Sequence, residues 1–377
     1  MVRGGFGVFY DLGHGFTGSA FSTGIFPFAR TLSLAETTFT APEFTVQPPP
    51  VNLNPPYSRV FAYSTGFQLP YTLQYNFTLE QGFGSRDTLA MAYVGASGWR
   101  LGRVESLRNV NASFRRIDAV RDNASSNYNA MQVQYRHPLS RDLQVLASYT
   151  FSKSLDTVSE ESQNNFQAPA ARLSPNADRG PSSFDVRHGF TAAGSYSIRL
   201  RSTNTLARAF LSGYAIDGTV RAMSARPVNV VTGRDPFGLG FTTVARPDVV
   251  AGQPLYLDDA NAPGGRRFNP AAFDSATPLA AGRQGTLGRN VLRGFGASQL
   301  DLSLRRQFRL SERLSLQGRV DAYNIFNHPS FDNPVAITRD ANFGRAIQTL
   351  ASGLGGLSAL YQVGGPRSLQ MALKLVF

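Results

Sequence analysis

The chain has 377 residues, a formal net charge of +12 and a charged fraction of 16%, which is low against the roughly 25% of soluble domains. Its apolar runs fall short of the roughly 20 residues that a transmembrane helix requires, so the composition argues against a compact soluble enzyme and against a helical membrane protein. Cysteine is absent, which excludes disulfides and thiolate metal sites.

Polar and apolar residues alternate along ten successive segments. A period of two is typical of strands that have lipid on one face and water on the other. We therefore expect antiparallel strands near residues 2–10, 67–83, 87–98, 127–137, 141–154, 185–199, 211–225, 297–310, 313–326 and 367–377. The mean hydropathy of −0.18 agrees with a barrel whose inward-facing side chains are polar.

The connections between these segments alternate in length. Short ones fall near 84–86, 138–140, 200–210 and 311–312, and long ones near 11–66, 99–126, 155–184, 226–296 and 327–366. Bacterial outer-membrane barrels have short periplasmic turns and long extracellular loops. The pattern therefore predicts an all-β fold, an antiparallel transmembrane β-barrel of the bacterial outer membrane with five long extracellular loops.

Two stripes of opposite polarity run along the segments near 297–310 and 313–326. We expect the apolar stripe to face lipid, and it consists of Leu300, Leu302, Leu304, Phe308, Leu314, Leu316 and Val320. We expect the polar stripe to face the barrel lumen, and it consists of Gln299, Asp301, Ser303, Arg305, Gln317, Arg319 and Asp321. A helix would scatter these charges around its circumference.

The basic residues do not form the cluster that nucleic-acid binding requires. Nearly all are arginine, with Lys153 and Lys374 as the two lysines, and they are scattered along the chain. Because an electrostatic footprint depends on clustering, we expect no nucleic-acid partner. We interpret the arginines as facing a hydrated lumen or anionic lipid headgroups.

No motif in the sequence predicts a catalytic, cofactor-binding or metal site. Gly13–Gly18 matches the GxGxxG pattern, but the residues after it do not predict the helix that a dinucleotide site needs. The paired acids at 160–161 and 258–259 lack an EF-hand pattern, so we interpret them as solvated loop charges rather than calcium ligands. There is no GxSxG sequence, and zinc-ligand spacing is missing among the histidines, which are His14, His137, His188 and His328.

Four stretches and the C-terminal segment carry a family resemblance. The stretches are SSNYNAMQVQYRHPLSRDLQVLASYTFSKSLD (125–156), DRGPSSFDVRHGFTAAGSYSI (178–198), RFNPAAF (267–273) and GTLGRNVLRGFGASQLDLSLRRQFRLSERLSLQGRVDAYNIFNHPSF (285–331). Together they resemble the Oar-like TonB-dependent transporters, a family of outer-membrane receptors. The terminal LQMALKLVF resembles the signal for the barrel-assembly machinery, carried by Leu369, Met371, Leu373, Leu375 and Phe377.

The resemblance implies that residues 1–377 are the C-terminal β-barrel segment of such a receptor. Family members have a plug domain, a TonB-contacting segment and further strands before this region, with about 22 strands in all. We therefore expect a partial barrel with neither plug nor signal peptide in these residues. The implied partners are outer-membrane lipid, lipopolysaccharide and the barrel-assembly machinery, with TonB a partner only if a plug lies upstream.

Three functional hypotheses remain open at this point. The first is substrate uptake across the outer membrane as part of a TonB-dependent transporter, and the second is a structural or adhesive surface barrel without transport. The third is a truncated fragment without independent transport. None of them involves an enzyme, and none requires a cofactor.

Overall fold

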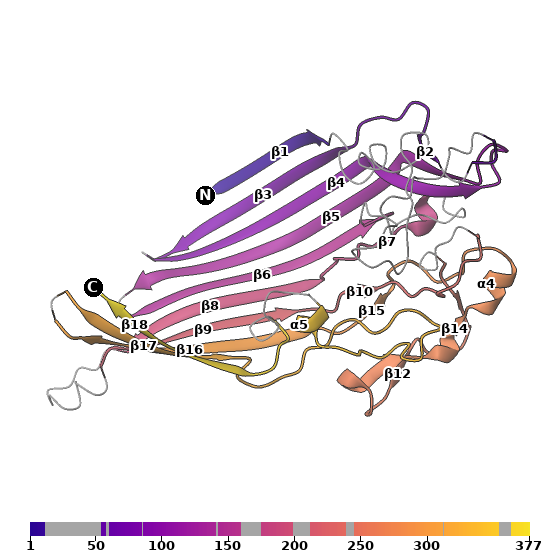
Figure 1. The fold of residues 1–377 in the computed structure, drawn as a ribbon. Coiled ribbons are helices and arrows are strands. Elements are labelled where there is room, and N and C mark those ends of the chain that lie inside the picture. The colour runs from indigo at the N-terminus through magenta and orange to yellow at the C-terminus, as the bar shows by residue number, and fades with distance from the viewer. Residues whose placement is uncertain are drawn as a thin grey trace, which may run out of the picture.

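The computed structural model describes residues 1–11, 54–57, 60–84, 86–140, 142–159, 175–198, 212–238, 245–311, 313–353 and 363–377. Its largest feature is a curved antiparallel sheet in which ten strands pair in chain order (Figure 1). They are β1 (Val2–Tyr10), β3 (Tyr71–Phe83), β4 (Asp87–Arg108), β5 (Arg116–Ser140), β6 (Leu143–Asp156), β8 (His188–Ile198), β9 (Tyr214–Met223), β16 (Ala297–Arg309), β17 (Ser315–Tyr323) and β18 (Ser368–Val376). The predicted all-β antiparallel fold is confirmed.

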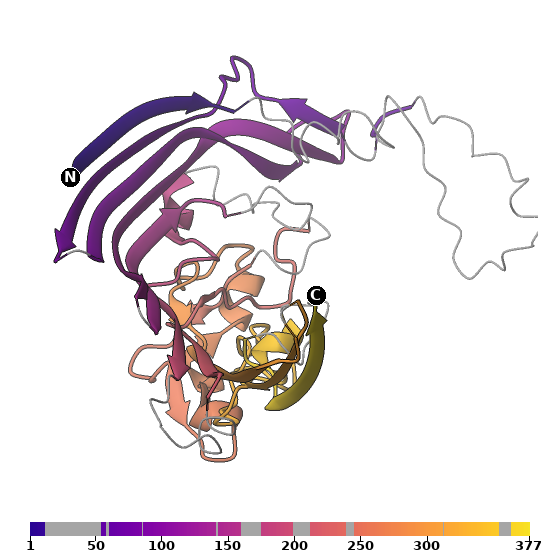
Figure 2. The same cartoon turned by 90° about the vertical axis from the view of Figure 1, so that its left-hand side faces the viewer.

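Two short strands complete a sheet of twelve. β2 (Val60–Tyr63) runs parallel to β5, and β7 (Gly180–Pro181) pairs with the end of β6. The order begins at β1 and ends at β18, so within the described residues these strands are the two open edges of the sheet. Figure 2 looks nearly along the strands and shows the sheet as an open arc.

The sheet has one apolar and one polar face because its register keeps like residues side by side. Leu304 on β16 lies opposite Val320 on β17, which lies opposite Met371 on β18, and all three are exposed. On the other face, Ser303 and Asp321 are paired and buried. The polar face is the concave one, where chain segments inside the arc pack against it. No helix in the described part of the chain is long and apolar enough to cross a membrane.

The expectation of a loop over residues 99–126 is wrong. β4 and β5 continue through this segment as a long hairpin, and only residues 109–115 connect them. The register shifts between Gly98 and Leu101 and again between Leu101 and Arg103. A bulge of this kind moves side chains to the other face of a strand, so the period-two pattern is interrupted although the strand continues. Similarly, β3 begins at Tyr71, four residues later than predicted.

The long segments after β9 and β17 contain ordered structure of their own, which we call the loop region (described residues 224–296 and 324–353). Its short elements are β10 (Pro227–Val228), β11 (Asp248–Val249), β12 (Tyr256–Asp258), η3 (Pro263–Gly265), β13 (Arg266–Phe268), η4 (Pro270–Ala272), β14 (Phe273–Asp274), α4 (Ala276–Ala280), β15 (Leu292–Arg293) and α5 (Leu350–Gly353). Strand pairs β10–β15, β11–β14 and β12–β13 stabilise it.

A small apolar core holds the loop region together. Phe268 and Leu292 are almost fully buried in it, and Phe273 and Phe343 meet edge to face with ring centroids 5.5 Å apart. Figure 1 shows the loop region at the strand ends opposite the two chain termini. In Figure 2 it lies within the arc of the sheet. The loop region therefore lies on the concave side of the sheet, at one end of its strands.

Candidate functional site

The polar face carries ion pairs both between neighbouring strands and within one strand. Arg305 on β16 donates through Nε to Asp217 Oδ2 on β9 at 2.8 Å and through Nη2 to Ser195 Oγ on β8 at 3.2 Å. Arg319 on β17 donates through Nε to Asp321 Oδ1 at 2.7 Å. Because the arginines remain partly exposed, such pairs add little stability and mainly give this face charges of both signs.

A polar depression of about 200 Å³ lies between β9, β16 and β17 on this face. The residues that line it are Asp217, Gly218, Thr219, Arg221, Asp301, Leu302, Ser303, Arg319, Asp321 and Tyr323. Its volume is below the roughly 300–1,000 Å³ of a typical small-molecule site. This depression can therefore hold water and small polar groups rather than a large ligand.

A buried carboxylate joins the long hairpin to the loop region. Asp178 lies in η2 (Pro175–Asp178), and its Oδ2 accepts a hydrogen bond from Arg103 Nη2 on β4 at 2.6 Å. Its Oδ1 accepts one from Arg246 Nη2 of the loop region at 2.9 Å. The side chain of Asp178 is 4% exposed, that of Arg103 0% and that of Arg246 7%. One acid thus connects three segments that are distant in the sequence.

Two further arginines of the loop region pair with acids near the strand ends. Arg289 binds the Asp156 carboxylate at the end of β6, and its Nε also donates to the Asp178 backbone carbonyl at 2.8 Å. Arg293 on β15 binds the carboxylate of Asp185, which precedes β8. All these acids are buried. Together with the Asp178 pairs, these contacts fix the loop region to the end of the sheet, and we call them the anchoring pairs.

Residues 1–370 match the family model described as the outer membrane beta barrel domain. The chain belongs to this family. Its amphipathic sheet is thus the barrel of a bacterial outer-membrane protein, and the predicted location is confirmed. No curated protein matches the barrel sequence.

Solved outer-membrane proteins resemble this barrel at low sequence identity. The outer membrane transporter YddB from Escherichia coli is 11% identical, with a TM-score of 0.47 over 85% of this chain and 34% of its own. The pyoverdine outer membrane receptor FpvA from Pseudomonas aeruginosa is 12% identical, with a TM-score of 0.43 over 82% and 30%. The ferric-catecholate import receptor Fiu from Escherichia coli is 12% identical, with a TM-score of 0.39 over 83% and 28%. This chain thus spans about a third of the length of each of these proteins.

The register brings the two predicted stripes to opposite faces of the barrel sheet. Ser303, Arg305 and Gln307 lie opposite Asp321, Arg319 and Gln317, whereas Leu304 and Phe308 lie opposite Val320 and Leu316. The remaining stripe residues in β16 are Leu300 and Leu302 on the apolar side and Gln299 and Asp301 on the polar side. Leu314 lies in the turn before β17, outside both strands.

The C-terminal residues form the apolar face of the edge strand β18. Leu369, Met371, Leu373 and Leu375 are at least half exposed, and Phe377, which follows the strand, is 94% exposed. Within the described residues they have no neighbouring strand beyond them. They thus present a continuous apolar row at the edge of the barrel segment.

Sequence reasoning missed the anchoring pairs because their partners are far apart in the chain. Asp156 and Arg289 are separated by 133 residues, and neither belongs to an amphipathic stripe. A signal was nevertheless present. The stretches that resemble Oar-like transporters contain five residues of these pairs, namely Asp156, Asp178, Asp185, Arg289 and Arg293.

Within the loop region, the ion pair between Arg283 and Asp248 shifts the pKa of the aspartate. Arg283 donates to both carboxylate oxygens of Asp248 at 2.6 and 2.9 Å. These hydrogen bonds, helped by the backbone N–H of Thr286, hold the pKa of Asp248 below its ordinary value. Asp248 lies in β11, so its charge state is coupled to the packing of the loop region.

Among the described residues, no group of three or more histidines and acids is arranged to hold a metal ion. His137 Nδ1 contacts Asp87 Oδ1 at 2.8 Å, and His188 Nδ1 contacts Tyr149 Oη at 2.8 Å. Both contacts join side chains on the barrel strands. The GxGxxG match, with His14, lies outside the described residues.

Proposed function

We propose that this chain is the C-terminal barrel portion of an Oar-like TonB-dependent transporter and takes part in substrate uptake across the outer membrane. The observation that carries the proposal is the loop region, held over the end of a polar concave face by buried arginine–aspartate pairs. In the predicted orientation, with the long segments outside, this region meets the substrate first. Residues 1–377 act as barrel, without a catalytic role.

A fixed loop region favours binding from dilute solution. Loops that become ordered only when they bind lose conformational entropy at that moment, which lowers their affinity. The anchoring pairs and the apolar core order the loop region beforehand. The polar face beyond it, with Arg305 and Asp217, then provides a hydrated wall for passage.

The same proposal assigns the convex apolar face to lipid. Exposed leucine and methionine side chains along β16 to β18 would be unfavourable in water and favourable in a bilayer. Lipid and lipopolysaccharide are therefore the proposed surroundings, and the row from Leu369 to Phe377 the proposed contact with the barrel-assembly machinery. TonB would be a partner only if the complete protein has a plug domain.

Uptake by cells that lack the gene tests the proposal. We expect the deletion to abolish growth on one large nutrient or chelate of a test panel, and the wild-type gene to restore it. Arg289→Ala should restore it poorly because it releases the loop region, whereas Asp258→Asn, an exposed change in β12, should restore it fully. Outer-membrane amount and heat-modifiable migration must be equal for both variants.

A surface adhesin is the second candidate, since an ordered loop region can also bind a surface and needs no plug. In that case the deletion would leave uptake of every panel substrate unchanged and would abolish attachment. The same strains therefore decide between the two functions.

A further inference from the structure

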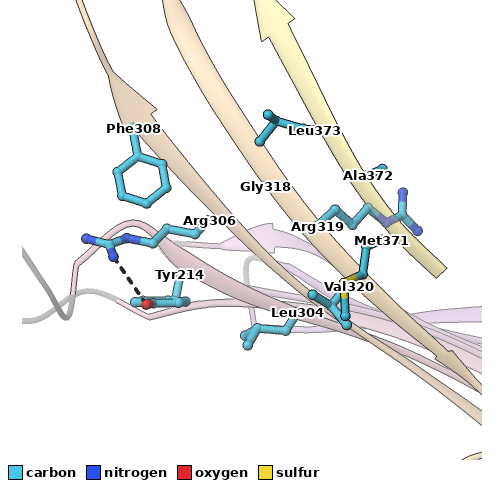
Figure 3. A pocket seen from close by; sticks show the side chains of 10 residues that line it. All are labelled: Tyr214, Leu304, Arg306, Phe308, Gly318, Arg319, Val320, Met371, Ala372 and Leu373. Atoms are coloured by element: carbon cyan, nitrogen blue, oxygen red, sulfur yellow. Dashed lines mark hydrogen bonds between the residues drawn. The ribbon is translucent and has the colours of Figure 1, made fainter. Parts of the chain in front are cut away.

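A groove crosses the apolar face near the end where the short turns lie. It has a volume of about 460 Å³ and is formed by β9, β16, β17 and β18 (Figure 3). This volume lies within the roughly 300–1,000 Å³ range of small-molecule sites. The lining is mostly apolar apart from two arginines. Arg319 is paired with Asp321, and Arg306 stands between Leu304 and Phe308 on the apolar face of β16.

Two aromatic rings hold the Arg306 side chain over the groove. Its guanidinium carbon lies 4.1 Å from the centroid of the Phe308 ring and 4.8 Å from that of Tyr214. Arg306 Nη1 also donates a hydrogen bond to Tyr214 Oη at 3.2 Å (Figure 3). These contacts orient a cation on a face that is otherwise apolar.

A glycine makes the groove deep beside this cation. Gly318 on β17 lies opposite Arg306 on one side and Leu373 of β18 on the other. A Cβ added at Gly318 would meet nothing within 4 Å. The missing side chain leaves open space between Arg306 and the apolar side chains of Met371 and Leu373.

The groove lies toward the short-turn end of the strands. Arg306 is four residues from Leu310 at the β16–β17 turn, which is about 10 Å along the membrane normal for a tilted strand. An arginine that faces lipid is strongly unfavourable at the bilayer midplane and nearly neutral near the interface. In the proposed orientation the short turns are periplasmic, so Arg306 meets the leaflet that is made of phospholipid.

We propose that this groove binds one phospholipid of the periplasmic leaflet. The lipid phosphate accepts hydrogen bonds from the Arg306 guanidinium, whose planar fork of donors fits phosphate geometry, and one acyl chain lies over Gly318 against Met371 and Leu373. This inference rests on the proposed assignment of the convex face to lipid. The cation favours an anionic headgroup over a purely apolar occupant.

Native mass spectrometry of the complete protein, purified from outer membranes in mild detergent, tests the proposal. We expect the wild type to retain one phospholipid. Arg306→Gln, which removes the charge, should lower retention at least about tenfold, and Gly318→Leu, which fills the open space while keeping the face apolar, should do the same. Arg309→Gln, on the polar face of the same strand, should retain lipid like the wild type.

Equal retention by the wild type and both groove variants would overturn the proposal, as would a wild type that retains no phospholipid. A wild-type dimer that Arg306→Gln dissociates would also overturn it and identify a second copy as the occupant. Heat-modifiable migration confirms that each variant is folded. Loss of uptake in the gene deletion, measured separately, keeps the test of the groove distinct from the test of transport.

Discussion

Replacement of Asp178 by asparagine should release the loop region from the barrel strands. The change keeps the shape of the side chain but removes the charge that Arg103 and Arg246 share at 2.6 and 2.9 Å. Removal of one partner of a buried ion pair commonly costs about 3–5 kcal/mol, because the other charge stays buried. Arg103 still has Glu105 nearby, at 3.6 Å, and Arg246 still donates to the Leu287 carbonyl, so the lower value applies.

A loss of about 3 kcal/mol corresponds to roughly a hundredfold increase in local opening. Hydrogen exchange of the complete protein in lipid nanodiscs measures this directly. We expect faster exchange of the amides of Thr232, which donates to Ala245, and of Gly285, which donates to Arg246. The amides of β16 should be unaffected, since opening is confined to the loop region.

Asp258→Asn is the matched control, because it makes the same chemical change at an exposed position of the same region. Surface substitutions away from special features change stability by about 0.5 kcal/mol or less. If Asp178→Asn accelerates exchange less than about fivefold, or if the control has an equal effect, the anchoring pairs do not hold the loop region and the reasoning fails.

Three further predictions concern the membrane face, assembly and pH. Met371→Arg should lower stability by about 1–2 kcal/mol in urea titrations in lipid vesicles, because Met371 is in register with Leu304, between the membrane interface and the midplane. Gln370→Arg, adjacent on the polar face, should lower it by about 0.5 kcal/mol or less; equal losses would contradict a lipid-facing Met371. Phe377→Ala should reduce the heat-modifiable protein in outer membranes several-fold, whereas Gln370→Ala should not; unchanged levels would exclude an assembly role for Phe377. Because Arg283 lowers the pKa of Asp248 from 3.8, this acid stabilises the loop region above that pH and ceases to do so as pH falls through its folded pKa. Exchange of β11 amides, corrected for intrinsic rates, should therefore rise below pH 3.8, and Asp248→Asn should remove this pH dependence.

Most strands were predictable because one of their faces is apolar and the other is polar. In β18, Leu369, Met371 and Leu373 alternate with Gln370 and Ala372, and the structure places them in one continuous strand. Such a pattern is local, so a single sequence is enough to detect it. The stripes along β16 and β17 were found for the same reason.

The strand structure of the β4–β5 hairpin beyond Leu101 was not predictable from alternation. Beyond the register shifts near Leu101, both faces of the hairpin are in contact with protein, and charged residues such as Glu105 and Asp118 are fully buried. Arg121 on β5 compensates Glu105 across the hairpin, with its Nε 2.9 Å from that carboxylate. Arg116 compensates Asp118 on the same strand, with its Nε 3.3 Å away. Alternation disappears when neither face is apolar, although the backbone pairing persists.

The anchoring pairs show what arginine can do in this chain that lysine cannot. A single guanidinium, that of Arg289, contacts Asp156 at the end of β6, the Asp178 carbonyl in η2 and the Ser159 hydroxyl. Five donors in a fixed plane can connect three segments at once, whereas a lysine ammonium is a compact point charge without this geometry. Two of the 37 lysine and arginine residues are lysines, so nearly every basic side chain has the planar fork that makes connections of this kind. An arginine paired with an acid adds nothing to the net charge, so the excess of +12 comes from arginines beyond these pairs.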